Sequence, residues 1–283
     1  SMSTVTTTRT SPSLSTMATR HSVQRNRTAP EPHGHSIWAL IYSNLTDSSL
    51  IWFLLIGISL TVLSAVGSAS KIVDNLNTSN QNAVDEAGLH FLRLGFALLL
   101  FVAMWGAGRI TKEFQDATIA THIAEHGGTG RLILHYALAS LPGGILFGVA
   151  GLFSGAVPGY LILHRHGAAM TIDGDVYRTA LGIILVSTLA APWGTCFGWL
   201  LRRAIPSALV LIAWTTFLEP IVVNWLPERV GKYLPGNLQS VLVLDPKATG
   251  DIHQAPAAAL LIAWTVTLSV IAFIGTRSRD LRG

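Results

Sequence analysis

The sequence is poor in charge and has almost no cysteine. Charged residues make up 12% of the 283 residues, about half the share found in ordinary soluble domains, near 25%. The single cysteine, Cys196, lies in an apolar run, so an intrachain disulfide is excluded. The basic residues are spread along the chain and do not gather in one domain, which argues against a nucleic-acid partner.

A nucleotide-binding motif is also missing. The pattern G-x-x-x-x-G-K-[ST] does not occur, because Tyr233 follows Gly231-Lys232 and Arg131 follows Gly130. The chain therefore carries no P-loop, and if it uses ATP a second polypeptide must bind the nucleotide. We expect no catalytic site and no cofactor in this chain itself.

Long apolar runs separated by polar segments dominate the sequence. About 20 apolar residues in a helix cross the ~30 Å hydrocarbon core of a bilayer, and backbone groups inside lipid must be satisfied within their own helix. We predict an all-α membrane protein whose transmembrane domain covers residues 35–280. Its six spans are predicted at about 49–68, 89–109, 132–155, 178–201, 204–225 and 257–276.

The segments outside these runs have their own patterns. Residues 1–34 are rich in Ser and Thr, contain arginines and lack apolar periodicity, so we predict a disordered basic tail. Segment 36–48 is predicted as a short amphipathic helix in the membrane interface, and 69–88 and 226–256 as loops. Pro142 and Pro158 predict that the third apolar run is a kinked helix with a short extension.

The distribution of Lys and Arg predicts the orientation of the chain. With the N-terminus inside, twelve of the 19 basic residues fall in the inner segments, which are also the shorter ones. This bias predicts that both termini are cytoplasmic. Tryptophans near the ends of the predicted spans indicate an interfacial aromatic belt. These tryptophans are Trp52, Trp105, Trp199 and Trp225.

Pairs of glycines four residues apart recur in the predicted spans. Such pairs let two helices approach closely. They are Gly144 and Gly148, Gly151 and Gly155, and Gly194 and Gly198. Two interpretations stay open, namely packing within one chain and a seam between two chains.

Glu219 is the only acidic residue well inside a predicted span. A charge at this depth costs about 2.5–3.5 kcal/mol on insertion scales, so such a residue is usually paired or faces a cavity. The adjoining Pro220 disfavours helical geometry at Glu219 and indicates a break in the helix. Glu219 either caps that break or lines a pathway.

Residues 122–126 read HIAEH, a pattern that can place two histidines on one helical face as zinc ligands. The segment is short, supplies no third ligand and is followed by two glycines. We interpret it mainly as a polar helix outside the membrane. An intramembrane metalloenzyme using His122 and His126 remains a minor alternative.

Four short motifs occur in a fixed order along the folded chain. They are EFQDATI at 113–119, LLRR at 200–203, Glu219-Pro220, and YLPG at 233–236. Together with the interfacial segment and the six apolar runs, this order resembles the ABC-2 type permeases, the membrane subunits of bacterial ABC exporters. The resemblance implies a type V exporter-like fold in the bacterial plasma membrane and a dimer with an identical or homologous permease chain.

The resemblance also implies two copies of a separate ATP-binding subunit, which would carry ATP and Mg. Segment 113–126 would dock into a groove of this ATPase, through residues Glu113, Phe114, Asp116, Thr118, Ile119, His122 and Glu125. A translocation pathway would run along spans two and five, with Phe101, Trp105, Ala213, Thr216 and Glu219 as candidates. Its apolar lining favours an amphipathic drug-, peptide- or lipid-like cargo. A non-transporting sensor or immunity protein stays open, since one fold hosts many functions.

Overall fold

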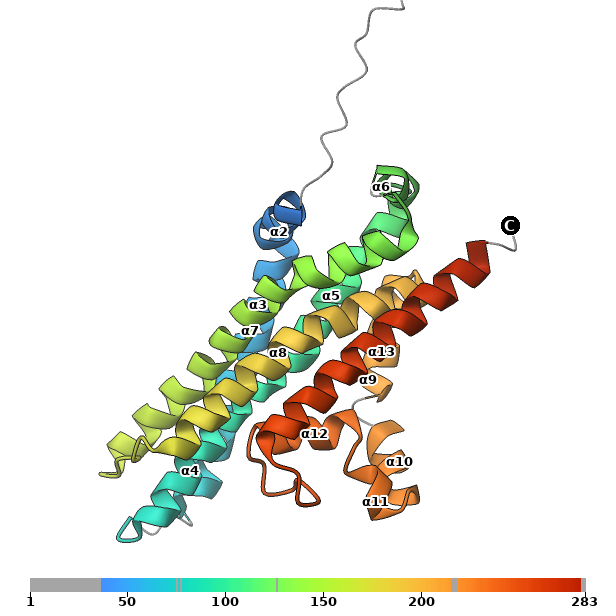
Figure 1. The fold of residues 1–283 in the computed structure, drawn as a ribbon. Coiled ribbons are helices and arrows are strands. Elements are labelled where there is room, and N and C mark those ends of the chain that lie inside the picture. The colour runs from blue at the N-terminus through green and yellow to red at the C-terminus, as the bar shows by residue number, and fades with distance from the viewer. Residues whose placement is uncertain (1–36, 75, 77, 126, 215–217, 281–283) are drawn as a thin grey trace, which may run out of the picture. The chain divides into compact units, whose positions relative to one another are not determined.

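The computed structural model describes residues 37–280 except 75, 77, 126 and 215–217. All secondary structure in the described residues is helical (Figure 1). The predicted all-α class is therefore confirmed. The predicted tail over residues 1–34 lies outside the described part of the chain.

Five helical stretches of the described chain are long and apolar enough to cross a membrane. They are α3 (Ser48–Asp74), α4 (Gln81–Leu94) continued through the short turn η1 (Gly95–Ala97) into α5 (Leu98–Gln115), α7 (Thr129–Arg165), α8 (Gly174–Leu201) and α13 (Gln254–Asp280). Large apolar side chains lie exposed along their outer faces, as Val266, Val270 and Ile274 do on α13. Such a surface suits lipid and not water, and the chain is a multi-pass membrane protein.

The fifth predicted span, 204–225, is not one membrane-long α-helix. α9 (Ala204–Ala213) and α10 (Glu219–Trp225) are each too short to cross a bilayer, and residues 215–217 between them are not described. Pro220 stands in the first turn of α10, where its missing N–H removes no helical hydrogen bond. α10 begins at Glu219, beside the predicted interruption at Glu219-Pro220, and the link between α9 and α10 over residues 215–217 lies outside the described residues.

Both segments predicted as loops contain helices. In 69–88, Asn80 caps α4 by accepting a hydrogen bond from Asn82 N at 3.1 Å, and Val84 is buried. In 226–256, α11 (Glu228–Gly231) is followed by α12 (Pro235–Leu242), in which Leu238 is buried. These segments are polar on average, but one face of α4 and one face of α12 pack on the bundle, a pattern that average polarity hides.

α7 is a single helix of 37 residues with Pro142 and Pro158 inside it. At 1.5 Å per residue it is about 55 Å long, so the predicted separate extension is wrong. Its glycines allow close neighbours: a Cβ at Gly144 would lie 2.7 Å from Thr188 Cα on α8. Gly155 in the same way meets the Phe91 carbonyl of α4. These glycines therefore serve packing within one chain, the first of the two interpretations.

The four tryptophans do not form one interfacial belt. Trp52 and Trp225 are 66% and 86% exposed, whereas Trp105 and Trp199 are each 1% exposed. Trp105 packs against Phe147, with ring centroids 6.0 Å apart. The belt prediction is therefore wrong for Trp105 and Trp199, because neighbouring helices cover the ends of their spans.

One apolar cluster defines an end of the helical unit. It joins α2 (Ile37–Thr46), α5, α7, α8 and the C-terminal half of α13 through Leu40, Ile110, Leu132, Trp199 and Ala272. α6 (Ile119–Glu125) packs on the same cluster, so we call this the α6 end. The start of α4 and helices α10 to α12 lie at the opposite end, the α12 end (Figure 1).

Candidate functional site

α5 and α6 meet in a tight corner, which contains the segment predicted to couple to an ATPase. α5 ends at Gln115, Ala117 adopts a left-handed conformation with φ of 57°, and α6 begins at Ile119. The Thr118 N–H donates to the Glu113 carbonyl at 3.2 Å and closes the last turn of α5. Segment 113–126 is therefore a helix end, a corner and a short second helix.

Glu113 points into this corner and not away from it. Its Oε2 atom accepts a hydrogen bond from the Thr118 hydroxyl and lies 3.9 Å from His122 Nε2. The Tyr136 hydroxyl of α7 lies 3.3 Å from His122 Nδ1. All of these side chains except Tyr136, which is buried, are half-buried. Glu113 and His122 thus hold α6 against α7.

Phe114 ties the corner to the end of α8. Its ring meets the edge of Trp199 at 5.3 Å between centroids, and the Arg202 guanidinium carbon lies 5.2 Å from the Phe114 centroid. Arg202 follows α8 in a left-handed conformation, with φ of 56°. A cation over an aromatic face is attractive by about 0.5–2 kcal/mol. The predicted basic turn 202–203 and the predicted coupling segment are therefore brought together.

Only part of the predicted docking set faces outward. Asp116 is exposed, next to the small exposed side chains of Ala120, Thr121 and Ala124. Phe114, Thr118 and Ile119 are half-buried like Glu113 and His122. α6 ends at Glu125, whose side chain lies outside what the structure describes. The open face of the corner is small, weakly charged and centred on α6.

No group of three His, Cys, Asp or Glu side chains that could hold a metal ion occurs among the described residues. His126 lies outside them. The two ring nitrogens of His122 face Tyr136 and Glu113. The described part of the corner thus gives the metalloenzyme alternative no support.

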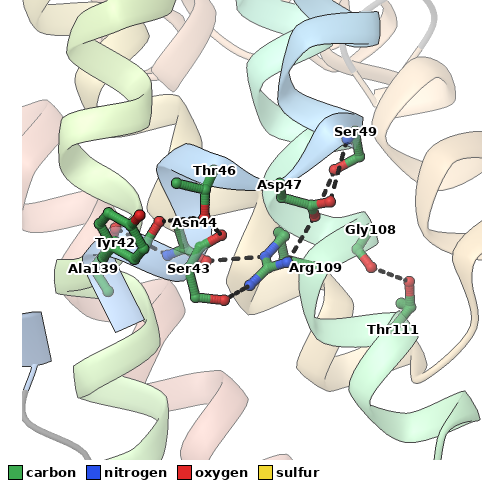
Figure 2. Close-up of polar contacts among 10 residues, drawn as sticks. All are labelled: Tyr42, Ser43, Asn44, Thr46, Asp47, Ser49, Gly108, Arg109, Thr111 and Ala139. Carbon is green, nitrogen blue, oxygen red and sulfur yellow. Dashed lines mark hydrogen bonds and ion pairs between the residues drawn. The ribbon is translucent and has the colours of Figure 1, made fainter. Parts of the chain in front are cut away.

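A polar network fastens α2 to the bundle beside this corner (Figure 2). Arg109, near the end of α5, donates from Nη1 to Asp47 Oδ2 at 2.6 Å and from Nε to Asn44 Oδ1 at 2.9 Å. Its Nη2 donates to the Ser43 hydroxyl at 3.2 Å. Asn44 in turn donates to the Ala139 carbonyl of α7 at 3.0 Å. Arg109 therefore fastens α5 to α2, and Asn44 continues the network from α2 to α7.

Asp47 separates α2 from α3 and serves both. Besides the Arg109 contact, it accepts hydrogen bonds from the backbone N–H and the hydroxyl of Ser49, at 3.2 and 2.8 Å. Burial acts to raise the pKa of Asp47, but the bonds from Ser49 and Arg109 outweigh it and leave this pKa below its ordinary value. Asp47 is therefore held as a carboxylate at neutral pH.

A cavity of about 190 Å³ lies among α5, α8, α9, α12 and α13. Its wall is mostly apolar and aromatic, with Glu219 and Gln239 as polar members. Glu219 Oε1 accepts a hydrogen bond from the Gly236 N–H in the first turn of α12. Leu234, which precedes α12, offers no side-chain cap, so Glu219 supplies one from α10. Glu219 therefore caps a helix and lines a cavity at once.

The other predicted pathway residues lie elsewhere. Phe101 packs beside Gly57 of α3, and Trp105 is buried against Gly143 of α7. Ala213 is half-buried at the last residue of α9. Thr216 lies outside the described residues. Among the members of the predicted set that the structure describes, only Glu219 borders the cavity.

Several site residues had not been singled out from the sequence. The sequence does not single out Arg109, Asn44 or Asp47: Arg109 is one of the twelve inner basic residues, and the other two lie in segment 36–48. Trp193 and Gln239 border the cavity from α8 and from a segment predicted as a loop. Of these residues, the sequence could have indicated only Arg109 as part of a site. A cation at the end of a span needs a partner, and Asp47 is an acid at the facing end of the first span.

Comparisons with family models, with curated proteins and with solved structures give no match. The class of the protein, a multi-pass helical membrane protein, therefore stands on its composition and its five long apolar helices.

Proposed function

We propose that this chain is the membrane-spanning subunit of an ABC-2 type exporter. It would act as a dimer with the same or a homologous chain in the bacterial plasma membrane, driven by two ATP-binding subunits that carry ATP and Mg. The observation that carries the proposal is the α5–α6 corner. It is anchored to α7 and α8 through Glu113, His122 and Phe114, and it leaves one face of α6 open.

Such a corner suits the transfer of motion. A partner that pushes on α6 moves α5 and α7 with it, because the contacts of Glu113 and His122 join the three helices. The Arg109 network extends the same rigid body to α2. ATP-driven closure of the partner would thereby reach the spans directly.

The course of the chain supports six crossings. α8 ends at the α6 end, whereas α12 lies beside the start of α8, where Gly182 meets the Leu242 carbonyl. Gly182 and Leu201 are 19 residues apart on α8, about 28 Å along the helix. The stretch between α8 and α12 covers this distance, which supports our proposal that α9 and α10 belong to a further crossing, the fifth of six in chain order. With six crossings both termini lie on one side, which we propose is the cytoplasm.

Cysteine labelling tests this topology. Cys196 is buried, so the wild-type chain gives a low background. Thr121→Cys on α6 and Asn82→Cys on α4 are exposed at opposite ends of the unit. A membrane-impermeant maleimide should label Asn82→Cys in intact cells and Thr121→Cys only after permeabilisation. Labelling of Thr121→Cys in intact cells contradicts the proposal, because no ATPase could reach α6.

Coupling is tested by pairing this chain with ATP-binding cassette subunits from its source organism. The pair, reconstituted in nanodiscs, should hydrolyse ATP faster than the ATPase alone. Ala120→Arg, on the open face of α6, should remove the stimulation, whereas Asn82→Arg at the opposite end should not. Equal stimulation by both variants would rule out α6 as the contact.

A further inference from the structure

The cavity bordered by Glu219 combines apolar walls with one acidic side chain among its described lining residues. Phe96, Leu100, Leu189 and Leu211 are among its apolar wall residues. Its volume, about 190 Å³, exceeds that of a 150 Å³ apolar cavity able to bind benzene. The space is therefore large enough for an aromatic ring or a short alkyl chain.

Polar groups converge on this space from two sides. Glu219 lies at the start of α10, and Gln239 lies on α12 one turn beyond Gly236. Trp214 also borders the cavity, and its buried indole N–H has no hydrogen-bond partner among the described residues. No basic side chain is among the described residues that line the cavity. The electrostatic character of the site is therefore acidic.

Glu219 has capacity to spare for a guest. The Gly236 N–H takes one position on Oε1, whereas a carboxylate can accept about four hydrogen bonds. A Cβ at position 236 would lie 2.6 Å from Oε1 and 2.9 Å from Oε2, so only glycine lets α12 approach the carboxylate this closely. Within the described part of the chain no second hydrogen bond reaches this carboxylate, so its remaining oxygen positions can accept one from a guest.

Aromatic faces add a second feature that favours cations. Trp193, Phe197 and Trp214 belong to the wall, and Trp193 Nε1 is fixed by donating to the Thr265 hydroxyl at 2.8 Å. Aromatic faces attract cations through their negative quadrupole. A half-buried carboxylate, in a cavity whose described wall contains aromatic rings and no basic side chain, is complementary to a positively charged amphipathic molecule and disfavours an anion.

We propose that this cavity binds small amphipathic cations, with a protonated amine at Glu219 and the apolar part among the aromatic walls. The inference rests on the proposed function, since it names the class of cargo for the same chain. The binding step itself requires neither nucleotide nor a partner protein.

Three isosteric probes test the inference on the purified full-length chain in phosphatidylcholine nanodiscs. Phenethylamine is the cation, 2-phenylethanol its neutral counterpart and phenylacetate the anion. Equilibrium dialysis with labelled probes, corrected for empty nanodiscs, gives the affinities. We expect phenethylamine to bind about tenfold more tightly than 2-phenylethanol. Phenylacetate should bind more weakly than either.

Glu219→Gln removes the charge and keeps an amide oxygen for the Gly236 N–H. It should lower amine affinity to the level of the alcohol and leave alcohol binding unchanged, which also reports an intact cavity. Gln239→Lys is the second variant, because its ammonium group competes with the guest for Glu219 and should weaken amine binding about tenfold. Glu86→Gln, an exposed carboxylate paired with Arg93, is the matched control and should change nothing.

Equal binding of amine and alcohol by the wild-type chain, or no saturable binding of any probe, overturns the inference. So does an amine preference that survives in both cavity variants, because the cation then binds elsewhere. ATPase stimulation that persists in a chain without amine preference overturns the cargo class alone. Amine binding without any ATPase stimulation instead contradicts the exporter and leaves the site in place.

Discussion

Arg109 and Asp47 form a close ion pair, with Nη1 and Oδ2 2.6 Å apart, between the end of α5 and the residue that joins α2 to α3. Their side chains are only 12% and 11% exposed. Since the same guanidinium also bonds Asn44 and Ser43, the pair determines where α2 lies against the bundle.

Arg109→Ala should destabilise the protein by about 3 kcal/mol, because the nearly buried Asp47 carboxylate then loses its cationic partner. Arg109→Lys keeps the charge but loses the forked geometry, so an intermediate loss is expected. Unfolding in mixed micelles measures both free energies. Equal stability of Arg109→Ala and wild type would show that the network does not hold α2.

The contribution of Asp47 should vanish in acid. Its pKa lies below the ordinary value when folded, so the stabilisation is present above the unfolded pKa of about 3.9 and is lost as pH falls through the lower folded pKa. Asp47→Asn should therefore be less stable than wild type at pH 7, and the gap should close below about pH 4. A gap independent of pH between 7 and 3 would contradict this.

Gly144→Ala should destabilise the α7–α8 contact by about 1–3 kcal/mol, the usual effect of overpacking. Its Cβ would lie 2.7 Å from Thr188 Cα and 2.8 Å from the Ser187 carbonyl oxygen, and backbone atoms cannot give way. Gly67→Ala on α3 is the matched control, since its Cβ would meet nothing within 4 Å. The control should be neutral or stabilising by up to about 1 kcal/mol, as thermal unfolding can show.

Glu113→Ala should loosen α6, because Thr118 and His122 lose the carboxylate they share. Backbone amides of α6 should exchange with deuterium about tenfold faster, which corresponds to the loss of about one charge-assisted hydrogen bond. Asp116→Asn, at an exposed neighbour, should leave the exchange unchanged. If Asp116→Asn accelerates exchange equally, the corner is held by something other than Glu113.

Glu219→Ala should unfasten the first turn of α12, whereas Glu219→Gln should not, because only the former removes the acceptor of the Gly236 N–H. Loss of a helix cap costs about 1 kcal/mol. Exchange at residues 236–239, followed by mass spectrometry, should increase in the alanine variant alone. An increase in both variants would mean that charge, and not hydrogen bonding, holds the turn.

Span positions were predictable where hydrophobic length alone decides. α3, α8 and α13 each contain their predicted spans, because lipid requires about 20 apolar residues whatever the packing. Prediction failed where packing decides. Leu238 is buried although its segment is polar on average, and Pro158 stays inside α7 because neighbouring helices support that helix.

The candidate site was predictable in part. The prediction of a break near Glu219-Pro220 rests on local chemistry, which a sequence displays, whereas the left-handed corner at Ala117 was not predicted, because alanine has no local preference for a positive φ. The inward direction of Glu113 does not, because it depends on Tyr136 and His122 meeting across two helices. The cavity was also hidden, since it requires α8, α12 and α13 to be neighbours in space.

The length of α7 fixes how deeply the protein sits in its bilayer. A helix about 55 Å long exceeds the ~30 Å hydrocarbon core of the bilayer even when it is tilted. Both ends of α7 therefore reach water. Arg131 at one end of α7 and Arg165 at the other are exposed charges, and moving either into the hydrocarbon core costs free energy. These charges therefore oppose displacement of the protein along the membrane normal. A thinner or thicker membrane must then change the tilt of α7 and of every helix packed along it.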